Sequence, residues 1–363
     1  MTQAVARTSL TDLALLFLRL GTIAFGGPAA HIAMMQQEVV HRRRWLTEQE
    51  FLDLISACNL IPGPNSTELA IHIGHRQAGF AGLLVAGICF IMPAAFIVLG
   101  LAWVYVKYSH LPTVGMVMAV VKPIIVVIVA RALFALAKSV LKGPFPIALC
   151  TAIFAACFFV PNELGLLLLA GVIAFGAACW RERNVLTSPV AALVAFVILL
   201  VLCVISFTAS TIHGGTAGAT VPLTLPNIFW YFTRTGSVLY GSGYVLLAFL
   251  RADLVSNWHW LTASRLLDAT AVGQFTPGPV FTTATFIGYV LAGFPGAALA
   301  TLGIFVPAFF FVTVSAPYVA KLRKSPLTSP ILDGINAGSL ALMAHVTVVL
   351  AVDAVTPLLQ LLR

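Results

Sequence analysis

The tripeptide Pro-Gly-Pro occurs twice in the sequence, and small polar side chains follow both copies. The first copy and the residues after it are Pro62, Gly63, Pro64, Asn65, Ser66 and Thr67. The second copy and its hydroxyl residues are Pro277, Gly278, Pro279, Thr282 and Thr283. Proline lacks an N–H group and clashes with the preceding turn, so a helix must end before each motif. A helix that begins after the motif presents free N–H groups and the positive end of its dipole. Two such helix starts that converge would suit a doubly charged oxyanion.

Titratable groups follow only the first Pro-Gly-Pro motif. Glu68, His72 and His75 are spaced i, i+4 and i+7, which places them on one face of a helix. The corresponding stretch of the second copy carries Thr283 and Tyr289 instead. A proton path, if the protein has one, therefore belongs to the first copy. The alternative is that the two histidines only make interfacial hydrogen bonds.

Two glycine-rich segments form a second pair of candidate helix breaks. They contain Gly26 and Gly27 in one case and Gly241 and Ser242 in the other. An arginine precedes each segment inside an apolar run, at Arg19 and Arg234. An arginine at membrane depth costs several kcal/mol unless it is paired or hydrated, so both are candidate anion-binding residues. The alternative is that they lie at helix ends and reach toward water.

The composition is that of a membrane protein that crosses the bilayer many times. Of the 363 residues, 60% are hydrophobic and only 9% are charged, against about 25% charged residues in soluble domains. The apolar runs predict an all-α polytopic protein with roughly ten to twelve membrane segments. The formal net charge is +8, but the basic residues lie in short loops, as at 41–44 and 321–324. This pattern is typical of loops that flank membrane spans, and it argues against nucleic-acid binding.

The chain is an internal duplication. An offset of 215 residues superposes the two Pro-Gly-Pro motifs, the Trp-Leu-Thr triplets at 45–47 and 260–262, and Asp53 on Asp268. We predict a first repeat over 1–185, a linking membrane segment and loop over 186–225, and a second repeat over 226–363. Thr47 and Glu50 form a capping-box pattern, which predicts a helix start before the first motif. Loops that match in the two repeats differ in charge: where one repeat has charged residues, the other has uncharged ones. This difference favours repeats that insert in opposite orientations.

Three segments resemble the chromate ion transporter family, in particular its long, two-domain members. They are Phe-Gly-Gly-Pro-Ala-Ala-His at 25–31, Pro-Gly-Pro-Asn-Ser-Thr-Glu at 62–68 and Gly-Gln-Phe-Thr-Pro-Gly-Pro-Val-Phe-Thr-Thr at 273–283. The resemblance covers nearly the whole chain. It implies a multi-pass protein of the bacterial inner membrane that exports chromate, driven by an ion gradient, and so confers resistance. Ser242 stands where relatives often have glycine, and Glu68 where many have glutamine.

Other functions are less well supported by the sequence. A carrier of sulfate or another tetrahedral oxyanion would need the same charge and shape of site, so this alternative stays open. A membrane-embedded enzyme is disfavoured, because H-E-x-x-H, G-x-S-x-G and a C-x-x-C pair are all missing. The pattern calls for no cofactor and no metal. The expected partners are a small inorganic oxyanion and the lipid bilayer, and the sequence leaves homo-oligomer formation open.

The loop charges predict the side of the membrane on which two equivalent positions lie. We expect residue 43 to face the cytoplasm and residue 258 to face the periplasm. In a cysteine-free background, Arg43→Cys should be protected in intact cells from a membrane-impermeant maleimide, and Trp258→Cys should react. Equal labelling of both positions from outside would mean that the halves are parallel.

Overall fold

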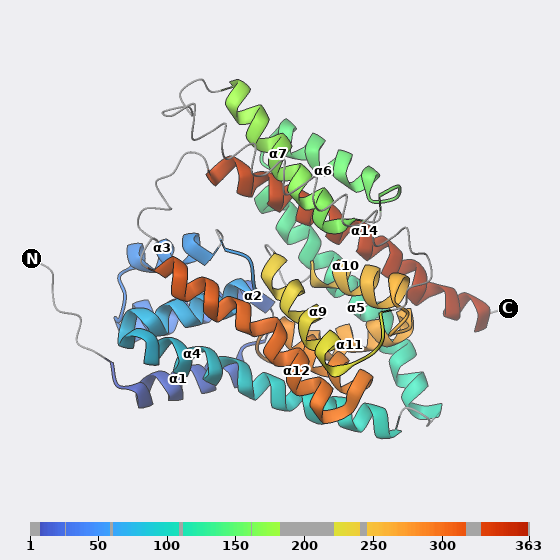
Figure 1. Ribbon diagram of the computed structural model, residues 1–363, viewed down its shortest axis with the longest axis horizontal. Coiled ribbons are helices and arrows are strands. Elements are labelled where there is room, and N and C mark those ends of the chain that lie inside the picture. The colour runs from blue at the N-terminus through green and yellow to red at the C-terminus, as the bar shows by residue number, and fades with distance from the viewer. Residues whose placement is uncertain are drawn as a thin grey trace, which may run out of the picture. The chain divides into compact units, whose positions relative to one another are not determined.

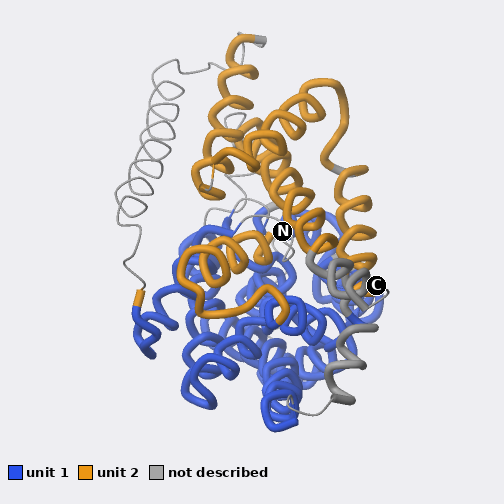
Figure 2. Tube along the Cα trace, turned by 90° about the vertical axis from the view of Figure 1, so that its right-hand side faces the viewer, with its two compact units in different colours: residues 1–122, 222–243, 265–323 blue, residues 123–221, 244–264, 324–363 orange. Residues whose placement is uncertain are grey.

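The computed structural model describes residues 8–25, 27–58, 61–108, 112–160, 162–181, 221–239, 245–316 and 328–361, and within them all regular secondary structure is helical (Figure 1). The chain forms two compact units, each of which takes segments from both sequence repeats (Figure 2). The first unit comprises residues 1–122, 222–243 and 265–323, and the second comprises 123–221, 244–264 and 324–363.

The first unit contains both Pro-Gly-Pro motifs. Its elements from the first repeat are α1 (Leu10–Ile23), α2 (Gly27–Gln36), the π-helix η1 (Gln37–Arg42), α3 (Glu48–Cys58) and α4 (Asn65–Tyr108). Its elements from the second repeat are α9 (Leu225–Val238), most of α11 (Ala263–Phe275), the 3₁₀ turn η4 (Val280–Thr282) and α12 (Thr283–Ser315). Helix α5 (Pro112–Val140) continues from the first unit into the second.

Four helices among the described residues are long and apolar enough to cross a membrane. They are Asn65–Tyr108, Glu163–Trp180, Val280–Ser315 and Pro330–Val352. Pro144–Ala156 is also apolar but shorter. The protein is therefore an all-helical membrane protein, while the expected ten to twelve membrane segments stay a prediction.

Helices α4 and α12 each fold back on themselves. In α4 the turn lies at Ala78 (φ −140°, ψ 25°) and Gly79 (φ 62°, ψ −147°), a positive φ that glycine adopts without strain. A Cβ on Gly74 would collide with the carbonyl oxygen of Gly82. In a straight helix these residues would be about 12 Å apart, so the two arms run back against each other. The turn of α12 has nearly the same angles, at Ala292 and Gly293.

Glycines also let the first helix of each repeat pack closely on the long helix of that repeat. In α1, a Cβ on Gly21 would collide with the carbonyl oxygen of Phe90 in α4. In α9, a Cβ on Gly236 would collide with the carbonyl oxygen of Ile304 in α12. These equivalent contacts hold the first helices at the same depth in their repeats. Large buried side chains of α1 and α4, including Phe17 and Phe90, fill the space beside the first contact.

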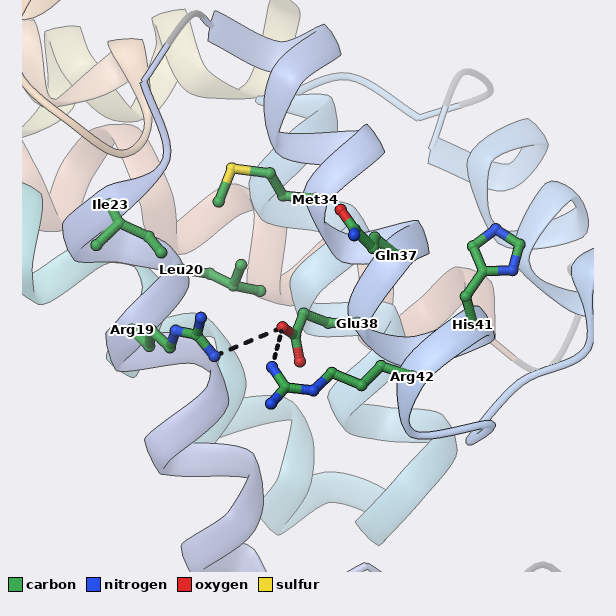
Figure 3. A pocket seen from close by; sticks show the side chains of 8 residues that line it. All are labelled: Arg19, Leu20, Ile23, Met34, Gln37, Glu38, His41 and Arg42. Atoms are coloured by element: carbon green, nitrogen blue, oxygen red, sulfur yellow. Dashed lines mark hydrogen bonds and ion pairs between the residues drawn. The ribbon is translucent and has the colours of Figure 1, made fainter.

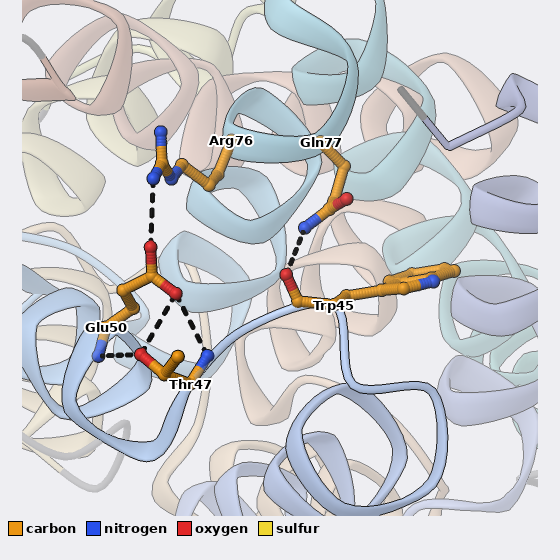
Figure 4. Close-up of polar contacts among 5 residues, drawn as sticks. All are labelled: Trp45, Thr47, Glu50, Arg76 and Gln77. Atoms are coloured by element: carbon orange, nitrogen blue, oxygen red, sulfur yellow. Dashed lines mark hydrogen bonds and ion pairs between the residues drawn. The ribbon is translucent and has the colours of Figure 1, made fainter. Parts of the chain in front are cut away.

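The predicted capping box is present at the start of α3 (Figure 4). The backbone N–H of Thr47 donates to Glu50 Oε2 at 2.9 Å, and the Glu50 N–H donates to Thr47 Oγ1 at 3.2 Å. Glu50 also accepts from Arg76 at 2.9 Å, close to the turn of α4. The Thr47 N–H and the Arg76 guanidinium hold the pKa of Glu50 below its usual value. This polar cluster ties α3 to the end of the first arm of α4.

The second unit is built mainly on α6 (Pro144–Ala156), α7 (Glu163–Arg181) and α14 (Thr328–Leu361). Helices α7 and α14 approach closely because Gly334 faces the carbonyl oxygen of Ala170. Small residues at helix contacts are typical of membrane proteins, where backbones must approach closely to gain van der Waals energy. The short α10 (Leu246–Leu250) and the π-helix η3 (Arg251–Asn257) belong to the same unit.

The return of α4 predicts a difference between two glycines of that helix. Gly74→Val places a side chain where the second arm lies, so it should lower the thermal unfolding temperature of the purified protein, at a cost of about 1–3 kcal/mol or more. Gly100→Val is the matched control, because a Cβ on Gly100 meets nothing within 4 Å. Equal unfolding temperatures for the two variants would contradict the close packing of the arms.

Candidate functional site

The two Pro-Gly-Pro motifs are linked reciprocally to the first helices of the opposite repeats. The backbone N–H of Gly63 donates to the carbonyl oxygen of Leu239, at the end of α9, at 2.6 Å. The N–H of Gly278 donates to the carbonyl oxygen of Ala24, at the end of α1, at 2.9 Å. Ala24 and Leu239 are themselves equivalent under the 215-residue offset. The same contact is therefore made twice, with the roles of the repeats exchanged.

Only glycine fits at the centre of each motif. Gly63 has φ +139° and Gly278 has φ +87°, both in the region that side chains rarely adopt. A Cβ on Gly63 would collide with the carboxylate of Glu68, and it would also touch Ala308 of α12. A Cβ on Gly278 would crowd Ala94 of α4 and the carbonyl oxygen of Gly21. Each motif therefore lies against the long helix of the other repeat.

The start of α4 gathers the buried polar groups of the first repeat. Ser66, Thr67, Glu68 and His72 are 0–3% exposed. Within the described residues, Thr67 Oγ1, both carboxylate oxygens of Glu68 and His72 Nε2 have no hydrogen-bond partner in the protein. Buried polar atoms are nearly always paired, so these four atoms are candidates for binding an additional polar group. His75 and Asn65 are only partly buried.

Ser66 has a partner that the motif alone did not identify. Its hydroxyl lies 3.2 Å from Nδ1 of His31, on α2, and Nε2 of His31 lies 3.1 Å from the carbonyl oxygen of Ala24. His31 is 1% exposed and makes an edge-to-face ring contact with Phe90. The sequence placed His31 beside Gly27, the first residue of α2, but gave no signal that it would bridge α1 and α4.

The second repeat satisfies its hydroxyls internally. Thr282 Oγ1 donates to the carbonyl oxygen of Pro279, and Thr283 Oγ1 donates to that of Val280, both at 2.8 Å. Both threonines are buried. Their hydroxyl protons are committed to the turn in this structure, so they differ from Thr67, which has no such bond. A second buried carboxylate lies in this repeat, where Asp268 accepts from Tyr105 Oη at 2.8 Å. No sequence pattern indicates this pair.

Arg19 lies in a pocket lined by residues of α1, α2 and η1, and none of the lining residues belongs to a Pro-Gly-Pro motif (Figure 3). It lines a pocket of about 540 Å³ and ion-pairs with Glu38 at 3.5 Å. Arg42 and Arg43 contact the same carboxylate at 3.0 and 3.6 Å. The side chain of Arg19 is 54% exposed, and Arg234 also lies at an exposed position. The structure thus does not bring the two arginines to the buried polar cluster, while Gly26, Gly241 and Ser242 lie outside the described residues.

The fold and the buried cluster together define a class of membrane protein in which interrupted helices place polar groups inside the apolar interior. Comparison with known proteins gives the family. The chromate transporter family model matches residues 11–177 and again 226–362, so the chain belongs to the chromate transporter family. No solved structure matches the chain.

Similar proteins extend over nearly the whole chain. A chromate transport protein of Cupriavidus metallidurans is 31% identical over 97% of this chain and 86% of its own length. A probable chromate transport protein of Synechococcus elongatus is 30% identical over 94% of this chain and 84% of its own. A chromate transport protein of Pseudomonas aeruginosa is 29% identical over 92% and 79%, respectively.

Proposed function

We propose that the protein exports chromate across the bacterial inner membrane, driven by an ion gradient, and so confers chromate resistance. The names of its relatives support chromate as the substrate. The observation that carries the site is the set of buried, unpartnered polar atoms at the start of α4, beside the first Pro-Gly-Pro motif. Buried polar groups of this kind inside a membrane protein mark a substrate or ion path.

The proposed anion site lies where the two motifs meet the ends of α1 and α9. The first turn of α4 offers its helix dipole, with Asn65, Ser66 and Thr67 as hydrogen-bonding side chains. Thr282 and Thr283 contribute from the second repeat once their hydroxyls turn away from the carbonyls that they now contact. Chromate and sulfate share charge and shape, so competition between the two anions measures the selectivity of this site.

Opposite orientation of the repeats is supported by the packing of α4 on α12. Gly87 lies about 12 Å beyond the turn of α4, and Phe309 lies about 24 Å beyond the turn of α12, at 1.5 Å per residue. The Phe309 ring nevertheless lies directly over Gly87. If the turns lay on the same side of the membrane, the two residues would differ in depth by about 12 Å. With turns on opposite sides of a bilayer they reach a common depth near its middle.

The clustering of Ile71 with Val312 leads to the same geometry. Both residues belong to one buried cluster. Ile71 lies about 12 Å from the turn of α4, whereas Val312 lies about 29 Å from the turn of α12. Parallel repeats would separate them by about 17 Å in depth. If the repeats are inverted, the helix starts that follow the two Pro-Gly-Pro motifs can therefore point at one anion.

Equivalent threonines test the anion site. Thr67→Val keeps the side-chain shape and removes an unpaired hydroxyl, so it should weaken chromate binding to the purified protein by about 1–3 kcal/mol. Thr282→Val should weaken it less, because that hydroxyl must first give up its bond to Pro279. Thr313→Val is a control, since Thr313 is exposed and bonds within its own helix. Unchanged affinity in both Thr67→Val and Thr282→Val would remove these residues from the site.

Glu68 is proposed to carry a coupling proton. Its carboxylate is fully buried without a partner, so a charge there is costly, while the helix start beside it favours the charged form. A bound dianion nearby would favour the protonated acid, which links anion occupancy to a proton. Glu68→Gln imitates the protonated acid. We expect vesicles with this variant to transport chromate without responding to an imposed pH gradient.

A wild-type response to the gradient in Glu68→Gln vesicles would make Glu68 a structural residue. Coupling would then have to be sought at His31, His72 or His75, or in another ion. Glu50→Gln is the control for loss of a carboxylate, because Glu50 is an exposed capping residue at the other end of the first arm of α4.

A further inference from the structure

His31 connects the proposed anion site to the reciprocal contact between the repeats. Its Nδ1 contacts Ser66 Oγ and its Nε2 contacts the carbonyl oxygen of Ala24, at 3.2 and 3.1 Å. The same carbonyl oxygen accepts the N–H of Gly278 from the second Pro-Gly-Pro motif. A single buried imidazole thus joins the end of α1, the start of α4 and, through Ala24, the second repeat.

The hydrogen-bond partners fix the protons of this bridge. A carbonyl oxygen can only accept, so Nε2 of His31 must carry a hydrogen. The imidazole is buried among uncharged partners, where a lone charge is costly, so Nδ1 is unprotonated and accepts a hydrogen bond. The hydroxyl of Ser66 must then donate its only hydrogen to His31. In this state Ser66 can offer nothing but lone pairs to an oxyanion.

Protonation of His31 reverses the direction of this hydrogen bond. A proton on Nδ1 would make the imidazole a donor at both nitrogens. Ser66 Oγ would then accept from His31, and its own hydrogen would be free to donate to an anion at the start of α4. The imidazolium would add a positive charge near the same place. Protonation and anion binding therefore each favour the other, by the same free energy in both directions.

We propose that His31 takes up a proton when the oxyanion binds and thereby turns the hydroxyl of Ser66 toward it. The inference rests on the proposed function, which places the anion beside Ser66. It assigns to His31 the role of a positioning residue rather than a direct ligand. The device belongs to the first repeat, since the equivalent position of the second repeat is Leu246.

The charged groups around the bridge are consistent with this role. Helix α2 packs against α1, η1 and α4. On α1 and η1, Arg19 pairs with Glu38, and Asp12 contacts Ser9. On α4, Arg76 pairs with Glu50, while Glu68 and His72 are the buried titratable groups of its first turns.

The test measures protons taken up when chromate binds to the purified full-length protein. Calorimetry at one pH in buffers of different ionisation enthalpy gives this number directly. We expect His31→Gln to take up about one proton fewer than the wild type and to bind chromate at least tenfold more weakly. Chromate is itself protonated in mildly acidic solution, so all variants are compared at the same pH, where that contribution cancels.

Two further variants separate proton coupling from a structural role. His31→Asn places an amide oxygen near the position of Nδ1, and His31→Gln can retain the bond to Ala24, but neither amide can be protonated. Ser66→Ala keeps the imidazole and removes the hydroxyl, so it should flatten the pH dependence of affinity. Because His31 and Ser66 act through one hydrogen bond, the double variant should bind no more weakly than the weaker single variant. His259→Gln, at an exposed loop position, is the control.

The outcomes distinguish the inference from the function on which it rests. Failure of the wild type to bind either chromate or sulfate would overturn the proposed function, and the inference with it. Chromate binding with the same proton uptake in the wild type, His31→Gln and His31→Asn would overturn the inference alone. Should both histidine variants fail to fold, an unchanged pH dependence in Ser66→Ala would also overturn it.

Discussion

The structure depends on one constraint, which is that backbone groups freed by a helix break inside a membrane must find partners within the protein. In each Pro-Gly-Pro motif, the N–H of the glycine donates to a carbonyl oxygen at the end of the other repeat's first helix, which satisfies this constraint. Glycines at 63 and 278 allow the approach, and small residues on the long helices leave the space for it. A site at these breaks, as proposed, would therefore be built jointly by both repeats.

Duplication gives the two repeats the same backbone but not the same chemistry. The turns at Gly79 and Gly293 have nearly identical angles. The residues that follow the breaks differ, because Thr283 bonds to its own turn whereas Glu68 is buried without a partner. A hydroxyl can satisfy itself locally, but a carboxylate has no proton donor of that kind when it is ionised. Among the described residues, the start of α4 in the first repeat thus carries buried polar atoms without partners. The hydroxyls that follow the second motif are already hydrogen-bonded.

The sequence predicted features that follow from local chemistry. The capping box of Thr47 and Glu50 and the all-helical membrane fold depend on neighbouring residues and on composition, respectively. It could not predict contacts that depend on how distant segments meet. The bridge from His31 to Ser66 joins residues 35 positions apart, and the partner of Arg19 is a carboxylate on η1 that no pattern marks. Ala-Gly occurs at 78–79 and again at 292–293, but nothing in the dipeptide itself indicates that each pair forms the sharp turn between two packed arms.

The reciprocal contacts also limit how the repeats can move. A transporter must expose its site alternately to the two sides of the membrane, often by movement of one repeat against the other. Rotation about the point where the motifs meet would keep both hydrogen bonds short while the outer ends of α4 and α12 shift. Because Ala24 accepts from both Gly278 and His31, any loss of the contact between repeats also changes the surroundings of the imidazole. The state of the site and the relative position of the repeats are thereby linked through one carbonyl oxygen.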